Sequence, residues 1–539
     1  MQMFFVAAGL AACLAIHRRP IQGGTALLLI FIELILTLAY TFVLGQGFLA
    51  STQYAILGTA QTLLTLVLST VAYRLSPFHP LASFPGPIVN KITSLRILYV
   101  VATGRRHLYI ESLHRKYGKF VRTGPNTLSI NSHAAVAPIY ANANAFDRSN
   151  AYILPGSTEK GIFFMTSRTQ HGARRRFWAG GFTSQSLANY FPTLVKRTDQ
   201  LMDCIARRSD RHGNVDIGDC IQHWSYDVMG DLTFGGSNRL ELMEEGDPRE
   251  LVKSGQLATC VFEILGEVPS LFQIAWYLPA TAIVRRLEDL AYDMMLARRA
   301  SGDTDNDLSS HILRGINDDD PFVDEYLRMD AIFAIQAGSD TTTGVVTLTI
   351  YLLLSHPDVA ERLRNELRSA FPSRDDVSIQ ALDDLAYLDA VVTESLRLGS
   401  PFPGLPRVVP DQGHVIDGVY VPGGTIVGVP AYAQEVAEEN FWPEPKAYKP
   451  ERWLPGGLGP GSRACKAAIM TFSYGPFGCL GKALAIQELK LLIAQLLLTY
   501  DFKFTPDFDP RAFEAGVRNL RTTLFDHPLK VQVARRAQI

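Results

Sequence analysis

The sequence has few cysteines, almost no net charge and no internal repeat. Its six cysteines, spread over 539 residues, follow no regular spacing, which argues against a disulfide framework and favours a reducing compartment. The formal net charge is -2, so no overall basic field attracts nucleic acid, and no nucleic-acid partner is expected. The length is too great for one small core and suits one large domain with an appendage.

Long uncharged runs are plentiful at the start of the chain. Residues 25–45 contain Glu33 as their sole charged residue, and residues 54–73 contain none; each run is long enough to cross a bilayer, which takes about 20 residues. Residues 3–16 form a shorter apolar run, and whether it also spans is left open. Two long runs in succession predict a membrane anchor over residues 1–76. Core helices of a soluble domain and a secretory signal peptide are the weaker interpretations.

Basic residues give the orientation of this anchor. Arg18, Arg19 and Arg74 should stay on the cytosolic side, while the uncharged residues 46–53 can be lumenal. Prolines cluster in residues 77–90, where they favour a stiff hinge. Residues 91–539 are then expected to form one cytosolic domain.

One cysteine lies in a glycine-rich loop ahead of a strongly apolar helix pattern. Residues 472–481 read Phe-Ser-Tyr-Gly-Pro-Phe-Gly-Cys-Leu-Gly, and the helix pattern covers residues 480–500. A helix N-terminus stabilises a thiolate, and glycines let backbone approach a large flat partner. A lone thiolate suits an iron porphyrin better than zinc, which needs three or four protein ligands. The alternative is that Cys479 is an ordinary buried cysteine.

This loop resembles the haem-binding signature of the cytochrome P450 family. Phe472, Gly475, Cys479 and Gly481 match that signature, and Phe477 stands where the family usually has arginine. The resemblance implies a mainly α fold with small β-sheets and a haem bound through Cys479. What replaces the usual arginine contact with a haem propionate is left open.

A second matching motif lies in the middle of the longest helix pattern, residues 326–354. Residues 337–343 read Ala-Gly-Ser-Asp-Thr-Thr-Thr, which places an acid and several hydroxyls in a buried run. Threonine hydroxyls can bond back to the i−4 carbonyl and open a kink. The resemblance implies that Asp340 and Thr341 relay protons during dioxygen activation. The alternative is a structural kink whose polar groups are all satisfied.

A basic turn and a later strand supply candidate partners for the haem propionates. His171 and Arg175 share a helix face at i, i+4, and a planar guanidinium suits a carboxylate. The resemblance assigns His171, Arg175 and Arg407 to the propionates. Arg174 and Arg176 are expected on a solvated face that can meet an acidic redox partner.

The resemblance also implies a structural triad and a substrate pocket. Glu394, Arg397 and Arg452 are expected to form a buried ionic triad that holds the cysteine loop. The long irregular stretch 142–167 is expected to cover the haem. The residues expected to face substrate are Phe163, Phe164, Met165, Phe333, Ala334, Ala337, Phe402 and Leu405. The alternative for Phe163, Phe164 and Met165 is that they belong to the core.

Together these motifs predict a membrane-anchored haem-thiolate monooxygenase of the endoplasmic reticulum. The resemblance implies haem b as cofactor and NADPH as electron source through NADPH–cytochrome P450 reductase, docked on a basic surface that includes Lys482, with cytochrome b5 as a further candidate partner. The sequence resembles filamentous-fungal members, which favours a lipophilic terpenoid or polyketide substrate of specialised metabolism. The alternatives are an O2-independent haem-thiolate isomerase or dehydratase and a non-catalytic haem-binding protein.

Overall fold

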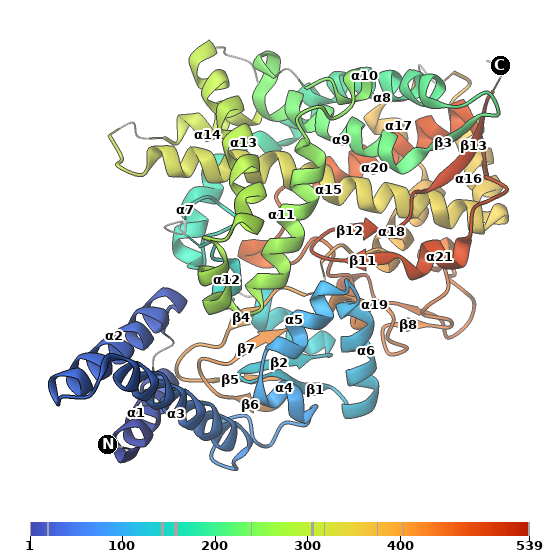
Figure 1. Cartoon of the computed structure of the whole chain (residues 1–539). Helices are drawn as coiled ribbons and strands as arrows, with labels where there is room; N and C mark the ends of the chain where they lie inside the picture. The colour runs from blue at the N-terminus through green and yellow to red at the C-terminus, as the bar shows by residue number, and fades with distance from the viewer. Residues whose placement is uncertain are drawn as a thin grey trace.

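A computed structural model shows a broad helical body, a smaller β-rich part and three N-terminal helices that project from one side (Figure 1). It describes residues 2–18, 21–141, 145–155, 160–238, 240–302, 307–316, 319–373, 376–402 and 404–536. Arg19, on which part of the expected orientation depends, lies outside the described residues.

The three N-terminal helices form a bundle. They are α1 (Gln2–Arg18), α2 (Gly23–Val43) and α3 (Phe48–Leu75), and α2 and α3 are each long and apolar enough to cross a membrane. The helix α1 runs parallel to α3, because the Phe5 ring lies against Gly58 and Thr70 contacts Cys13 Sγ at 3.6 Å. The short apolar run of residues 3–16 therefore forms a helix that packs along α3 in the bundle.

The only Asp, Glu, Lys or Arg inside the two long runs, Glu33, is hydrogen-bonded within the bundle. The Thr62 hydroxyl of α3 donates a hydrogen bond to Glu33 Oε1 of α2 at 2.6 Å. A polar group in an apolar surrounding is costly unless it is hydrogen-bonded. This contact therefore fixes how α2 and α3 face each other.

The bundle contacts the body at two places. The amide of Gly23 donates to Gln273 Oε1 at 2.6 Å, which joins α2 to α12 (Pro269–Ala275). A Cβ on Gly23 would lie 2.0 Å from the Ser270 carbonyl oxygen, so only glycine fits there. Where α3 ends, Arg74 Nη1 donates to the Ile92 carbonyl at 2.6 Å.

The helical body is organised around α15 (Val323–Ser355), which packs against α9 (Ile217–Phe234) and α20 (Lys482–Thr499). Apolar side chains of these three helices share the largest core cluster with those of α8, α16 and α18. The other helices are α4 (Ile88–Ile92), α5 (Leu95–Ala102), α6 (Arg106–Tyr117), α7 (Arg168–Ala179), α8 (Ser184–Arg208), α10 (Leu242–Glu245), α11 (Leu251–Gly266), α13 (Ala282–Ser301), α14 (Leu308–Arg314), α16 (Pro357–Ala370), α17 (Ile379–Asp383), α18 (Ala386–Leu398), α19 (Ala431–Glu435) and α21 (Pro510–Ala515).

The strands form small sheets at the side of this body. The largest has the order β1-β2-β7-β4, in which β1 and β2 are antiparallel and β2 and β7 are parallel with Leu128 opposite Val427. Its strands are β1 (Phe120–Gly124), β2 (Thr127–Ile130), β4 (Arg407–Val408) and β7 (Ile426–Gly428). The smaller sheets contain β3 (Asn214–Asp216), β10 (Tyr500–Phe504) and β13 (Lys530–Arg535); β5 (His414–Ile416) and β6 (Val419–Val421); β8 (Phe441–Trp442) and β9 (Arg463–Ala464); and β11 (Val517–Asn519) and β12 (Thr523–Phe525). The predicted mainly α fold with small sheets is confirmed.

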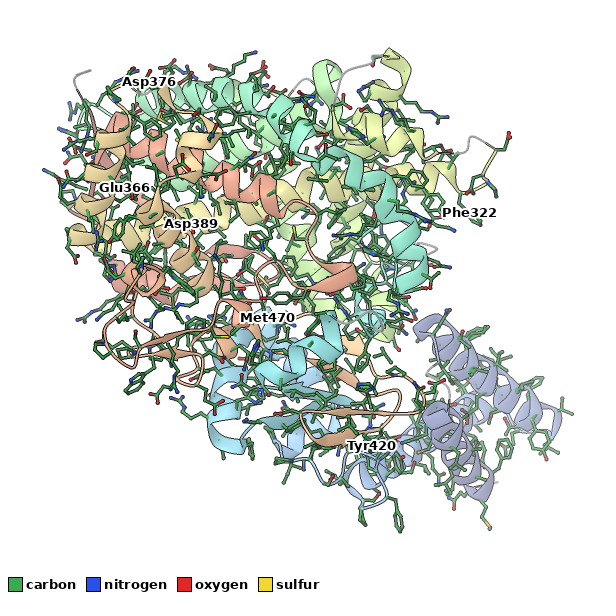
Figure 2. All side chains as sticks on the ribbon, turned by 180° about the vertical axis from the view of Figure 1, so that it is seen from behind. Phe322, Glu366, Asp376, Asp389, Tyr420 and Met470 are labelled. Atoms are coloured by element: carbon green, nitrogen blue, oxygen red, sulfur yellow. The ribbon has the colours of Figure 1, made fainter. Side chains whose placement is uncertain are left out.

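The cysteine loop begins inside the molecule. Met470, just before it, is buried and lies near the middle of the view from behind (Figure 2). Beside it, Arg397 Nη2 lies 2.6 Å from Glu394 Oε1, and Arg452 Nε lies 3.5 Å from the same oxygen. All three side chains are buried. Removing one member of a buried ionic group leaves an uncompensated charge. The expected role of this triad in holding the cysteine loop stays a prediction.

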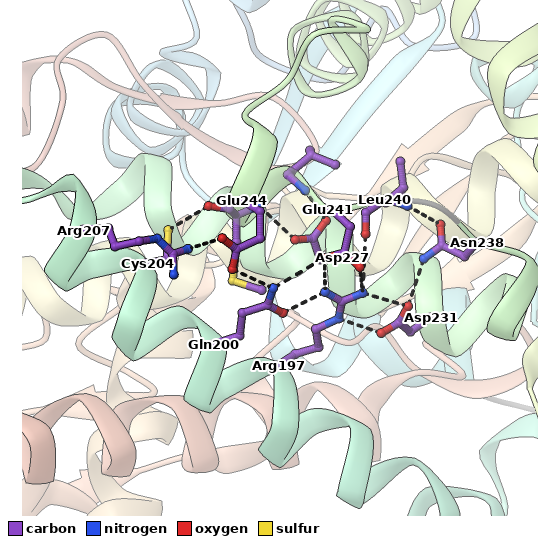
Figure 3. Close-up of polar contacts among 12 residues, drawn as sticks. Arg197, Gln200, Cys204, Arg207, Asp227, Asp231, Asn238, Leu240, Glu241 and Glu244 are labelled. Atoms are coloured by element: carbon purple, nitrogen blue, oxygen red, sulfur yellow. Dashed lines mark hydrogen bonds and ion pairs between the residues drawn. The ribbon is translucent and has the colours of Figure 1, made fainter.

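A second ionic cluster lies away from the cysteine loop and holds three helices together. Arg197 of α8 lies between Asp231 of α9, at 2.7 Å, and Glu241 at the start of α10, at 2.8 Å (Figure 3). Asp227 accepts hydrogen bonds from the amides of Leu242 and Met243. These contacts stabilise the packing of α8, α9 and α10. None of the residues that make them lines the internal cavity.

Candidate active site

An internal cavity of about 300 Å³ lies between α15, α7, α11 and the cysteine loop. Most of its wall is apolar, and many of the lining side chains are aromatic. Cys479 lines the same cavity, together with Phe472, Leu480 and Gly481. The cavity thus presents one thiol, that of Cys479, to a large apolar space.

The backbone of the loop holds this sulfur in place. The amide of Cys479 donates to the Phe472 carbonyl at 2.8 Å, and Arg175 Nη1 donates to the Gly478 carbonyl at 2.5 Å. The side chain is exposed and lines the cavity. Burial raises the pKa of the Cys479 thiol, while the Gly481 backbone and the charges of Arg175 and Lys482 act in the opposite direction.

The glycines of the loop have different roles. Gly481 lies in the cavity wall, and a Cβ there would lie 3.9 Å from Cys479 Sγ. Gly475 has φ +66°, and a Cβ there would lie 2.1 Å from the Tyr140 carbonyl oxygen. Gly475 shapes the loop against the Tyr140 backbone, and its expected contact with the cofactor stays a prediction.

The helix α15 contributes Asp340 and Thr341 to the wall of the same cavity. The Thr341 hydroxyl donates to the Ala337 carbonyl at 2.6 Å, which is the i−4 bond that the sequence predicts. The helix remains continuous through this point. Because the hydroxyl proton of Thr341 is taken by Ala337, its lone pairs remain available to accept a hydrogen bond from the cavity.

Asp340 is a buried carboxyl with one partner that the sequence did not reveal. The Tyr226 hydroxyl, from α9, donates to Asp340 Oδ1 at 3.0 Å, and Oδ2 has no hydrogen-bond partner. Burial raises the pKa of Asp340 to about 7, although the side chains of Tyr226 and Gln336 both oppose the rise. Asp340 can therefore both hold and release a proton near neutral pH.

Basic side chains gather at one end of the cavity. His171 and Arg175 line it, and Arg407 lies beside Phe477, which lines it too. Burial and three neighbouring guanidiniums lower the pKa of His171 to about 2, so this imidazole is neutral. Arg148, which the sequence reasoning missed, is buried in the same group and donates to the Phe163 carbonyl at 2.8 Å.

The basic turn of α7 is corrected at one position. Arg174, expected on a solvated face, is buried and pairs through Nε with Asp330 Oδ2 at 2.8 Å. The Trp178 indole donates to the same oxygen. Arg176 is exposed, as expected for a solvated face. Sequence spacing on α7 could not show this pairing, because Asp330 lies 156 residues away on α15.

The aromatic part of the cavity wall contains most of the residues expected to face substrate. The Phe163 and Phe333 rings stack with centroids 4.7 Å apart. The expected residues found in the wall are Phe163, Phe164, Phe333, Ala334, Ala337, Phe402 and Leu405. Met165 is the exception, because it lines a separate groove beside α7. Pro403, within the stretch expected to line the pocket, lies outside the described residues.

One further acid in the cavity wall was missed. Glu488 of α20 is buried, accepts a hydrogen bond from the Thr342 hydroxyl at 2.9 Å, and has no partner for Oε1. Burial raises the pKa of Glu488 to about 8. Glu488 is the one acidic residue in the apolar run 480–500. A single acid in such a run could have been recognised from the sequence as a candidate buried carboxyl.

The cavity fits a flat apolar group that carries carboxylates and a thiophilic metal. Arg148 Nε, Arg407 Nε and His171 Nδ1 are buried without a hydrogen-bond partner. Among the described residues, no carboxylate pairs with Arg148, Arg175 or Arg407. Buried cations without counter-charge are costly, and haem propionates would supply that charge. The single sulfur of Cys479 suits the axial position of an iron porphyrin.

Comparisons with known proteins agree with this geometry. The family model described as Cytochrome P450 matches residues 85–526. The cytochrome P450 monooxygenase BipB of Cochliobolus sativus is 33% identical over 454 residues, which cover 80% of this chain and 88% of BipB. The cytochrome P450 monooxygenase AKT7 of Alternaria alternata is 32% identical over 467 residues, which cover 82% of this chain and 88% of AKT7. Tryprostatin B 6-hydroxylase of Neosartorya fischeri is 29% identical over 453 residues, which cover 82% of this chain and 80% of the hydroxylase.

The family model covers most of the chain, and the relatives align over nearly their whole length. Membership implies a haem with a cysteine thiolate ligand, which is what the sulfur and the unpaired basic groups of the cavity fit. On these grounds, the chain belongs to the cytochrome P450 family.

Proposed function

We propose that this protein is a membrane-anchored monooxygenase that inserts one oxygen atom from O2 into a lipophilic small molecule of fungal specialised metabolism. The observation that carries this proposal is that Cys479, Asp340 and Thr341 line the same largely apolar cavity. A thiolate-ligated haem, when bound, supplies dioxygen activation and oxygen transfer. The protein then has to bind substrate, exclude water and move protons.

Residues of this chain suit each of those tasks. Cys479 would hold the iron, and Arg148, Arg175, His171 and Arg407 would bind the propionates. Asp340, with a pKa that burial raises to about 7, holds a proton in an otherwise apolar wall. Its unpartnered Oδ2 can release that proton into the cavity, where Thr341 Oγ1 can accept hydrogen bonds. An O2-independent isomerase would have no use for this acid and hydroxyl.

The substrate class follows from the cavity wall and its surroundings. Aromatic rings contributed by Phe163, Phe262, Phe272 and Phe333 favour an apolar substrate. Phe272 belongs to α12, the helix that α2 of the anchor contacts through Gln273. A lipophilic compound dissolved in the bilayer would therefore meet the protein close to this wall. The named activities of the relatives also favour specialised metabolism.

We further propose that electrons arrive from NADPH through a reductase in the same membrane. The domain boundaries proposed are residues 1–76 for the anchor, 77–90 for the hinge and 91–539 for the cytosolic domain, with the endoplasmic reticulum as location. Lys482 and Arg176 are exposed and lie on the elements that flank the cysteine loop. Both are suited to an acidic electron-transfer partner.

Spectroscopy of the full-length protein tests the ligand first. The reduced protein with carbon monoxide should give the absorption band of a thiolate-ligated haem, and Cys479→Ser should lose it while Cys465→Ser keeps it. A band typical of histidine ligation in the unmodified protein would reject Cys479 as the ligand.

Turnover tests the reaction type. A lipophilic library is screened for compounds that shift the haem absorption, and each hit is incubated with NADPH, reductase and 18O2. One labelled oxygen atom in the product is expected. Product formed without O2 or NADPH would favour the isomerase alternative, and hits that bind without any turnover would favour a non-catalytic haem protein.

A further inference from the structure

Phe477, the residue that departs from the usual family pattern, lies at the centre of the basic group. The guanidinium carbon of Arg148 lies 4.3 Å from the centroid of its ring, and that of Arg407 lies 4.9 Å away. The His171 ring lies 4.5 Å away, tilted by 48°. These partners come from the 145–155 segment, β4 and α7, so one ring joins three segments that are distant in sequence.

The two arginines are held by groups that leave their charge uncompensated. Arg148 Nη1 donates to the carbonyls of Ile162, Phe163 and Met165 at 2.8–3.1 Å. Arg407 Nη1 donates to the Tyr152 hydroxyl at 3.3 Å and to the Pro406 carbonyl at 3.2 Å. In both side chains Nε is buried without a partner. The carbonyls and hydroxyl orient the guanidiniums, and the positive charge stays available to an anion.

An aromatic ring is well suited to this position. The face of phenylalanine attracts a guanidinium within about 6 Å, and the attraction is stronger where water is excluded. An arginine at 477 would instead add a cation beside Arg148, Arg175 and Arg407, and like charges disfavour each other in a buried site. The pKa of His171 reflects the same crowding in part, because burial lowers it most and the surrounding guanidiniums lower it further.

We propose that Phe477 is a positioning residue whose ring holds Arg148 and Arg407 in place to bind the haem propionates, so that Arg148 supplies the cation missing from the cysteine loop. This inference rests on the proposed haem site. It assigns Arg148 a direct role in cofactor binding and Phe477 an indirect role through the two arginines.

A double-mutant cycle tests this coupling without any need for substrate. The variants are Phe477→Leu, Phe477→Tyr, Arg148→Gln and the double variant Phe477→Leu/Arg148→Gln, all in the full-length protein loaded with haem. The readouts are the rate of haem transfer to excess apomyoglobin and the reduction potential of the bound haem. Phe477→Leu should release haem about tenfold faster, given the strength of a desolvated cation–π pair. Phe477→Tyr keeps the ring and should stay within about twofold of the unmodified protein.

The cycle separates this role from ordinary packing. In the Arg148→Gln background, Phe477→Leu should change haem release less than about threefold, because one of the two arginine partners of the ring is already gone and only Arg407 remains. Equal effects of Phe477→Leu in both backgrounds, or a Phe477→Tyr variant that behaves like Phe477→Leu, would overturn the proposal. So would tighter haem binding by Phe477→Arg. Failure of the haem site itself would be distinct, because the unmodified protein would then lack the thiolate-type band with carbon monoxide.

Discussion

Replacing Tyr226 by phenylalanine should raise the pKa of Asp340. Burial raises the pKa of Asp340 to about 7, and the Tyr226 hydroxyl, donating to Oδ1 at 3.0 Å, opposes that rise by stabilising the carboxylate. A hydrogen bond to a charged acceptor contributes about 1.5–3 kcal/mol, and one pKa unit corresponds to about 1.4 kcal/mol. Loss of the hydroxyl should therefore shift the pKa upward by about one to two units.

Infrared difference spectroscopy measures this shift directly, through the C=O stretch of the protonated carboxyl between pH 5 and 10. Asp340→Asn identifies the band, which is needed because burial also raises the pKa values of Glu435 and Glu488 to about 8. The matched control is Tyr351→Phe, whose hydroxyl donates to Glu514 and does not contact Asp340.

The same shift should appear in catalysis with a compound from the spectral screen. Proton donation needs the protonated acid, which is present below its pKa, so product formed per NADPH should decline as pH rises through about 7. In Tyr226→Phe that decline should move to higher pH. A midpoint near pH 4 in the unmodified protein, or no upward movement in Tyr226→Phe, would refute the reasoning.

Three further outcomes are expected. Thr341→Ala should lower product per NADPH by about 10²-fold and release more peroxide, with recovery in Thr341→Ser; unchanged coupling would exclude the hydroxyl from proton delivery. Glu394→Gln, which breaks the buried triad, should lower the free energy of unfolding by about 3–5 kcal/mol and therefore lower the midpoint temperature of thermal unfolding. The control Glu439→Gln, at an exposed position, should leave that midpoint unchanged. Equal midpoints for the two variants would mean that stability does not depend on the triad. Deleting residues 1–76 should move the protein to the soluble fraction with its carbon monoxide spectrum intact; persistent membrane binding would locate another anchor, and loss of haem would make the bundle part of the core.

Local sequence patterns predicted much of this protein. Apolar runs of sufficient length located α2 and α3, helical periodicity located α15 and α20, and the spacing around Cys479 identified the family. Such features depend on near neighbours, because helix periodicity and loop glycines act over a few residues. The back-bond from Thr341 to Ala337 was predictable for the same reason, since it lies within one helical turn.

Tertiary contacts decided the rest, since partners far apart in sequence carry no local signal. The Tyr226–Asp340 pair is 114 residues apart and the Arg174–Asp330 pair 156 apart. The position of Arg148 beside Phe477 arises because two loops meet at the end of one cavity. The sequence by itself determined which chemistry this chain can hold. The packing of α9, α15 and the cysteine loop decided which charges are buried, which stay unpaired and which acid has a pKa near neutral pH. Burial and neighbouring charges set these properties only in the folded protein.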